Sequence, residues 1–146
     1  MASSERRLLL DVNALVALAW PNHQFHRAVL ARLERRPAPP WATCALTQLG
    51  FVRLSSNPAV VGARRTPAQA VELLAELVGD GRHSYLKYLP ALPELTAGYR
   101  RLLGHQQVTD AYLLAVAARN DAVLLTLDRR LASGGKADSA VEVIVP

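Results

Sequence analysis

Short apolar segments alternate with helical segments along the whole of this 146-residue chain. A short apolar run between turn residues predicts a buried β-strand, whereas apolar residues that recur every three or four positions predict a helix. Strands that alternate with helices form a parallel sheet that is covered by helices on both faces. The sequence therefore predicts a three-layer α/β/α fold with five strands, at residues 8–12, 41–44, 83–89, 122–127 and 141–145.

Start and stop signals mark the helices between these strands. Pro21 ends the first helix. Thr66 followed by Pro67 is typical of a helix start, with threonine as the N-cap and proline in the first turn. Thr109 is expected to cap a later helix in the same way. The expected helices span residues 13–20, 23–36, 46–54, 66–78, 93–103 and 110–119.

Length and cysteine content narrow the class of protein further. By length the chain is expected to be one domain over residues 1–146. Its only cysteine, Cys44, excludes an intrachain disulfide and a cysteine-based zinc site, and it suits a reducing cytoplasm. Residues 1–7 are polar and no apolar run reaches the roughly 18 residues of a membrane span, so we expect neither a signal peptide nor a membrane segment.

The chain carries a formal net charge of +5, and 15 of its 17 basic residues are arginine. Arginine binds phosphate through two parallel hydrogen bonds, which suits a polyanionic partner. A genome whose base composition favours arginine codons would produce the same bias, so charge alone leaves both interpretations open. Arg129 and Arg130 are the best candidates for phosphate contacts because they directly follow an acid at a predicted strand end.

Three aspartates occupy positions that the predicted sheet would bring together. Asp11 and Asp128 lie at the ends of the first and fourth strands, and Asp110 opens the helix that leads into the fourth strand. The carboxyl ends of parallel strands share one edge, which is where ligands bind in open α/β sheets. Carboxylates in one crevice repel one another unless a cation lies between them, and Mg²⁺ prefers such oxygen ligands. Each aspartate alone could instead cap a helix or turn, and the sequence leaves that alternative open.

Four segments together resemble the PIN-domain ribonucleases, specifically the VapC-type toxins of bacterial type II toxin–antitoxin systems. They are LDVNAL, TCALTQLGFVR, VTDAYLLA and LTLDRRL, at residues 10–15, 43–53, 108–115 and 125–131. The resemblance implies a PIN-like sheet with strand order 3-2-1-4-5 and endonucleolytic hydrolysis of RNA that depends on Mg²⁺, with Mn²⁺ as a substitute. In such a reaction the metal polarises the scissile phosphate and lowers the pKa of a bound water. The resemblance also implies a bacterial cytoplasmic location, a cognate VapB-type antitoxin and a homodimer.

The resemblance assigns roles residue by residue. Asp11 and Asp110 match the family's first and third acids and are the expected direct metal ligands. Asp128 matches the acid that closes the cluster, often through water. These three acids are therefore the expected catalytic residues. The small polar residues that orient the carboxylates correspond to Asn13, Thr109 and Thr126.

Gln48 departs from the family pattern. The helix after the second strand usually provides a glutamate, and the corresponding position here is Gln48. An amide offers an oxygen but no charge, so the site would carry three carboxylates rather than four and would bind metal more weakly. Two interpretations follow: a working nuclease with a weakened site, or a weakly active or inactive PIN-like module that binds RNA or the antitoxin.

Two other protein classes place an aspartate at a strand end in a similar fold. A phosphoacceptor receiver domain would require an acidic pair after the first strand and a lysine after the last. Here Asp11 stands alone, and the two lysines, Lys87 and Lys136, lie elsewhere. A dehalogenase-type phosphatase would require a second aspartate where Asn13 stands. The sequence therefore favours the PIN-like interpretations.

Overall fold

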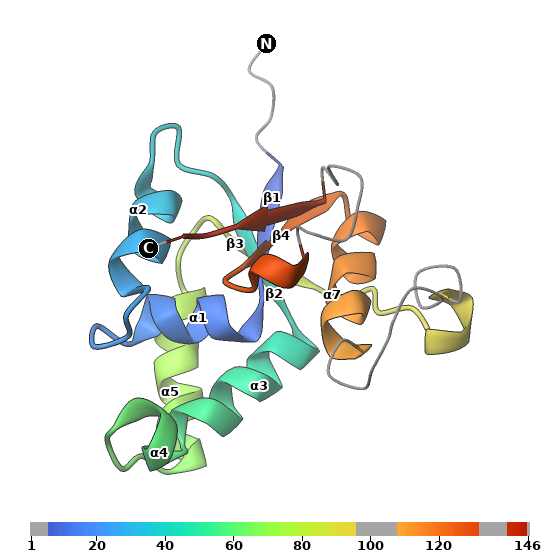
Figure 1. Cartoon of the computed structure of the whole chain (residues 1–146). Coiled ribbons are helices and arrows are strands. Elements are labelled where there is room, and N and C mark those ends of the chain that lie inside the picture. Colours follow the sequence, from blue (N-terminus) through green and yellow to red (C-terminus); the bar gives the residue numbers. More distant parts are fainter. Residues whose placement is uncertain (1–5, 96–107, 132–139, 146) are drawn as a thin grey trace.

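A computed structural model of the chain describes residues 6–95, 108–131 and 140–145. Its strands are β1 (Arg7–Leu10), β2 (Trp41–Cys44), β3 (His83–Leu86), β4 (Ala122–Thr126) and β5 (Val141–Val143). They form one sheet in the order β3-β2-β1-β4-β5, and every neighbouring pair is parallel (Figure 1). This confirms the predicted α/β class and the strand order that the resemblance implied.

The central strand β1 lies between β2 and β4. Leu8 pairs with Trp41 of β2, and Leu10 pairs with Leu125 of β4. The ladder continues one residue past β1, where the backbone N–H of Asp11 donates to the carbonyl oxygen of Leu125 over 3.0 Å. The segments that leave β1 and β4 therefore start side by side at the carboxyl edge of the sheet.

Helices cover both faces of the sheet (Figure 1). They are α1 (Val12–Ala19), α2 (His26–Glu34), α3 (Ala45–Ser55), α4 (Pro58–Val61), α5 (Pro67–Val78) and α7 (Val108–Arg119), with short 3-10 turns η1 (Leu92–Leu95) and η3 (Arg129–Leu131). The helices α1, α2, α3 and α5 pack on one face, and α7 packs on the other. Across the described ranges, no helix is both long enough and apolar enough to span a membrane.

Two hydrophobic cores form because successive residues of a strand point to opposite faces of the sheet. In β1, Leu8 and Leu10 belong to the core shared with α1, α2, α3 and α5, whereas Leu9 belongs to the core shared with α7. All three leucines are buried. Both faces of the strand are covered, and this explains why the sequence shows a continuous apolar run here rather than an alternating one.

The close contact between α1 and α3 depends on Gly50. A Cβ atom at this position would lie 2.5 Å from Cγ2 of Val12, which is closer than real side chains pack. A second contact joins the C-cap of α1 to α3: the indole N–H of Trp20 donates to the hydroxyl of Ser55 over 3.0 Å. This packing holds α3 against the helix that directly follows Asp11.

Two element boundaries that were predicted next to polar residues are wrong. The first strand ends at Leu10 rather than at residue 12, because Asp11 is the N-cap of α1 and the helix starts at once. The helix α7 already includes Val108, so Thr109 lies inside its first turn and is not its N-cap. Both errors arise where a polar side chain at an element boundary has more than one hydrogen-bonding role open to it.

The other expected strands, and the other expected helices apart from the one over residues 93–103, are present, most of them with shifted ends. The third strand stops at Leu86 rather than at residue 89. The short helix α4 was not predicted; Asn57 caps it by accepting a hydrogen bond from the backbone N–H of Ala59. Of the helix expected over residues 93–103, the described part contains only the turn η1, and residues 96–103 lie outside it.

Candidate active site

The three predicted catalytic aspartates lie at the carboxyl edge of the sheet. Asp11 directly follows β1, Asp128 follows β4 after one intervening residue, and Asp110 lies in the first turn of α7. The charges of Asp110 and Asp128 both act on the carboxyl group of Asp11. The structure thus brings together acids from three separate elements, and we refer to these three residues as the acid cluster.

Asp11 is buried, and both of its carboxylate oxygens are engaged inside the protein. Oδ1 accepts from the backbone N–H of Ala14 over 2.7 Å, and Oδ2 accepts from the hydroxyl of Thr126 over 2.5 Å. Burial raises the pKa of Asp11 to about 6; these hydrogen bonds oppose the shift, and the charges of Asp110 and Asp128 add to it. Asp11 therefore caps α1 and belongs to the acid cluster at the same time.

Thr126, the last residue of β4, links two members of the acid cluster. Its hydroxyl donates to Asp11 and also accepts from the backbone N–H of Asp128 over 3.1 Å. Thr126 is fully buried. A single hydroxyl therefore orders the turn after β4 together with the carboxylate after β1, which supplies a physical basis for the supporting role expected of this residue.

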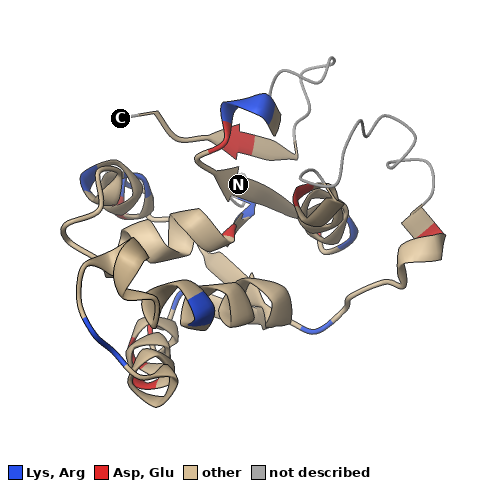
Figure 2. Cartoon of the chain, turned by 60° about the horizontal axis from the view of Figure 1, so that its bottom comes forward, with Lys and Arg blue, Asp and Glu red and all other residues tan. Residues whose placement is uncertain are grey.

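Arg130 engages both carboxylate oxygens of Asp128. Its Nε donates to Oδ1 over 3.1 Å and its Nη2 donates to Oδ2 over 2.9 Å, while its backbone N–H donates to Oδ1 over 2.9 Å. The guanidinium hydrogen bond holds the pKa of Asp128 below its usual range because it stabilises the charged form. Figure 2 shows the turn η3 in blue, since two of its residues are arginines. Asp128 thus caps η3, as the capping alternative suggested.

Asp110 is partly buried in the first turn of α7. Burial raises the pKa of its carboxyl group, and the negative charge of Asp128 raises it further. The positive charge of Arg130 acts in the opposite direction. Asp110 is therefore coupled electrostatically to both partners of the Asp128–Arg130 ion pair.

The acid cluster offers the oxygen donors that a hard divalent cation prefers. The pKa values of Asp11 and Asp110 are raised in part because the carboxylates repel one another, and a cation among them would remove that repulsion. As the side chains stand, the described residues contain no group of three His, Cys, Asp or Glu arranged to hold a metal ion. Both carboxylate oxygens of Asp128 accept hydrogen bonds from Arg130 instead. The donor types fit Mg²⁺, but Asp128 can join them only when its contact with Arg130 is broken.

The side chain of Gln48 is directed to strand β2. Its Nε2 donates to Oγ1 of Thr43 over 3.0 Å, and this hydroxyl shares a hydrogen bond of 2.8 Å with Nε2 of His83 on β3. Thr43 is fully buried. No local sequence pattern marks this trio, because only the pairing of β2 with β3 brings Thr43 and His83 together.

The remaining residues singled out from the sequence are exposed. Asn13 and Thr109 lie in the first turns of α1 and α7. Arg129 lies in η3, and among the described residues its side chain has no hydrogen-bond or ion-pair partner. The two neighbouring arginines therefore differ: Arg130 is engaged by Asp128, whereas Arg129 faces solvent.

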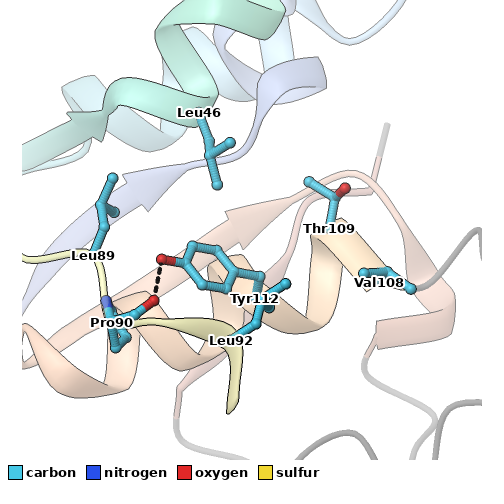
Figure 3. A pocket seen from close by; sticks show the side chains of 7 residues that line it. All are labelled: Leu46, Leu89, Pro90, Leu92, Val108, Thr109 and Tyr112. Atoms are coloured by element: carbon cyan, nitrogen blue, oxygen red, sulfur yellow. Dashed lines mark hydrogen bonds between the residues drawn. The ribbon is translucent and has the colours of Figure 1, made fainter. Parts of the chain in front are cut away.

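An apolar pocket adjoins the first turn of α7 (Figure 3). Its volume is about 350 Å³. The hydroxyl of Tyr112 donates to the carbonyl oxygen of Pro90 over 2.6 Å and ties α7 to the segment after β3. No local sequence pattern marks this pocket, because its walls come from three segments that are distant in the chain. It is lined by Leu46, Leu89, Pro90, Leu92, Val108, Thr109 and Tyr112.

The chain has a parallel sheet with acids gathered at its carboxyl edge, next to β1 and β4. This arrangement limits the classes of protein to which the chain can belong. The family model of the PIN domain matches residues 8–136. The matched range contains all three members of the acid cluster, the strands β2, β3 and β4, and all of β1 except its first residue. Fold, acid cluster and family match together define a PIN domain.

Similarity to individual proteins narrows the branch of the PIN-domain family. The chain is 39% identical to Ribonuclease VapC39 of Mycobacterium tuberculosis over 137 residues, which are 93% of this chain and 98% of that protein. It is 41% identical to Ribonuclease VapC38 of the same organism over 120 residues, 82% of this chain and 84% of that protein. Ribonuclease VapC44 is 37% identical over 127 residues, with coverages of 86% and 89%. The chain therefore belongs to the PIN-domain family, in its VapC-type branch.

Proposed function

We propose that the chain is the toxin of a type II toxin–antitoxin system and hydrolyses RNA phosphodiester bonds as a Mg²⁺-dependent endoribonuclease. The observation that carries this proposal is the convergence of Asp11, Asp110 and Asp128 from three separate elements at one edge of the sheet. The ribonuclease names of the VapC relatives support the reaction class. The formal net charge of +5 suits a polyanionic substrate.

The chain's own residues would bind the metal and orient the reaction. Asp11 and Asp110 would bind it directly, and Asp128 would bind it through water, with Mn²⁺ as an alternative ion. When bound, Mg²⁺ would polarise the scissile phosphate and lower the pKa of the attacking water. Thr126 and the first turn of α1 already hold Asp11 in one orientation, so its carboxylate need not be ordered when RNA binds.

Arg129 would hold a phosphate of the RNA backbone next to this site. It is exposed, follows Asp128 directly and has no side-chain partner among the described residues. A guanidinium fork matches a phosphate in geometry and charge. Arg130 would contribute to RNA binding only after Asp128 releases it, because its donors already bind that carboxylate.

An RNA-cleavage assay tests the proposal. Purified protein is incubated with total bacterial RNA in the presence of Mg²⁺, Mn²⁺ or a chelator, and the product ends are mapped. We expect discrete cleavage sites with either metal, none with the chelator, and none in the Asp11→Asn or Asp110→Asn variants. Cleavage that persists with the chelator would contradict the metal dependence.

The second candidate function is a PIN-like module that binds RNA or an antitoxin with little or no cleavage. It is favoured by Gln48, which adds no charge to the site and whose amide donates to Thr43. Absence of cleavage at excess Mg²⁺ or Mn²⁺, in protein that still binds its antitoxin, would support this function over the nuclease.

The proposal includes two protein partners, a VapB-type antitoxin and a second copy of the chain. Large apolar side chains are exposed on helices that pack together: Leu49 of α3 is 65% exposed, Val60 of α4 is 48% exposed and Val71 of α5 is 51% exposed. Exposed apolar side chains on adjoining helices are candidates for a dimer interface. Light scattering after size exclusion tests this: we expect a dimer for the wild type and a monomer for Leu49→Asp, and a monomeric wild type would contradict the homodimer.

A further inference from the structure

Arg130 engages the carboxylate oxygens that Asp128 would offer to a metal ion or to its bound water. Its guanidinium donates to both carboxylate oxygens, over 3.1 Å at Oδ1 and 2.9 Å at Oδ2. The turn η3 keeps the two residues together, since the backbone N–H of Arg130 also donates to Oδ1. The carboxylate expected to close the metal site thus already has a cation.

The two partners of this ion pair differ in how firmly they are held. The backbone N–H of Asp128 donates to the buried hydroxyl of Thr126, and the Asp128 side chain is 25% exposed. The side chain of Arg130 is 67% exposed. Exposed ion pairs are weak and are screened by salt. Arg130 can therefore leave while Asp128 stays in place.

We propose that Arg130 is an internal counter-ion that competes with the metal ion for Asp128, so that metal binding and the Asp128–Arg130 contact exclude each other. The inference rests on the proposed metal dependence of the site. Its basis is the occupation of both Asp128 oxygens, because a guanidinium within hydrogen-bond distance of a carboxylate would repel a divalent cation at the same oxygens. Arg130 is a positioning residue, since it acts through Asp128.

Competition lowers the metal affinity of the resting protein and makes that affinity dependent on ionic strength. The positive charge of Arg130 also acts on Asp110, so its departure affects two members of the acid cluster. Once released, the guanidinium remains beside the proposed phosphate-binding side of η3. The structure thereby separates the roles of two arginines that look equivalent in the sequence.

Calorimetric titration of the 146-residue chain with Mn²⁺ at low ionic strength tests the competition. We expect Arg130→Ala to bind Mn²⁺ about three-fold more tightly than the wild type, the size expected for loss of an exposed ion pair. Arg130→Lys keeps the charge but loses the two-pronged contact, so its affinity should fall between the two. Arg129→Ala is the matched control: it removes the same charge from the same turn, and we expect near wild-type affinity.

Measurements in the Asp128→Asn variant separate the effect of the Asp128–Arg130 contact from the longer-range effect of the Arg130 charge. In that background, adding Arg130→Ala should tighten Mn²⁺ binding less than it does in the wild type, because the contact with Asp128 is already lost and only the charge effect on Asp110 remains. An equal gain in Mn²⁺ affinity in Arg129→Ala and Arg130→Ala would show that the effect comes from net charge alone, and it would overturn the proposal. Unchanged or weaker binding in Arg130→Ala would overturn it as well.

Failure of the proposed function gives a different result. If neither the wild type nor any variant binds Mn²⁺, the metal dependence fails and the competition fails with it. If the wild type binds Mn²⁺ and loses binding in Asp11→Asn, but does not respond to Arg130→Ala, only the competition is rejected. Circular dichroism of each variant shows whether these exposed substitutions leave the fold intact.

Discussion

The hydroxyl of Thr126 donates to Oδ2 of Asp11 over 2.5 Å, between residues 115 positions apart in the chain. Both residues are buried, so water cannot replace this hydrogen bond. The contact joins β4 to β1 beyond their last ladder bond and holds the carboxylate in one orientation. The same hydroxyl accepts from the backbone of Asp128, so two members of the acid cluster depend on it.

Thr126→Val should destabilise the metal-free protein. Valine keeps the shape of threonine but removes the donor to a buried carboxylate, and hydrogen bonds to charged groups are worth about 1.5–3 kcal/mol. We expect a loss of that size in the free energy of unfolding, measured in urea with a chelator present. Thr126→Ser retains the hydroxyl and should lose less. A valine variant as stable as the serine variant would contradict the assigned hydrogen bond.

Asp11→Asn should abolish RNA cleavage without destabilising the metal-free fold. Asparagine retains an oxygen that accepts from Ala14, and it removes a buried charge whose ionisation is costly. Thermal unfolding with a chelator should show a midpoint equal to or above that of the wild type. Asp121→Asn, which changes a side chain that is 92% exposed, is the control for loss of one negative charge. Unfolding of Asp11→Asn at ordinary temperature would mean that capping is the main role of this residue.

Gln48→Glu should tighten Mn²⁺ binding and lower the stability of the metal-free protein. The added carboxylate increases repulsion among the acids, whereas hard cations prefer a charged oxygen to an amide oxygen. A gain of about 1–3 kcal/mol in metal binding is expected for a charge-assisted contact. Calorimetric titration of both proteins at matched pH measures it. An unchanged affinity would show that position 48 stays with Thr43 and takes no part in the metal site.

The stability of the metal-free protein should depend on pH through His83. Burial lowers the pKa of this ring, and the charge of Asp80 opposes the shift. The pKa of His83 in the folded protein lies below its unfolded value of about 6.5, so folding favours the neutral ring. The stability that the neutral ring contributes is complete above about pH 6.5 and is lost as the pH falls below that value. Between about pH 7.5 and pH 5.5, the free energy of unfolding should therefore fall more in the wild type than in His83→Gln.

Asp11 contributes to the pH dependence with the opposite sign. Its pKa is raised to about 6 in the folded protein, so the folded state takes up a proton more readily than the unfolded chain and gains stability as pH falls. The pH dependence of the wild type alone therefore mixes several groups, since the pKa values of Asp110 and His23 are shifted as well. The test is therefore the difference in the free energy of unfolding between wild type and His83→Gln at each pH. A difference that stays constant with pH would contradict the role of His83.

RNA binding should weaken steeply with salt, because each neutralised phosphate releases counterions. Arg129→Glu should flatten this dependence by removing a phosphate contact. Arg53→Glu, on α3, makes the same change of charge away from η3 and is the control. Binding measured by fluorescence anisotropy over a range of salt concentrations tests this, and affinity that is indifferent to salt would refute the polyanion interpretation.

The order of strands and helices could be predicted from the sequence because it depends on local patterns. The run Leu8–Leu10 is apolar at every position because both faces of β1 are covered, and Pro67 after Thr66 marks a helix start through short-range sterics and hydrogen bonding. The positions of two acids at one edge could be predicted for a related reason. Asp11 and Asp128 each follow an apolar run, and the carboxyl ends of parallel strands share one edge of the sheet.

The tertiary structure alone decided how the side chains at that edge are partnered. Asp11 meets Thr126 because β1 and β4 pair in one register, and Gln48 meets Thr43, which in turn meets His83, because β2 pairs with β3. Even neighbours in sequence were not equivalent, since the turn η3 directs Arg130 to Asp128 and leaves Arg129 in solvent. Local patterns determine which element a residue joins, whereas strand register and turn geometry determine which atoms come within hydrogen-bond distance.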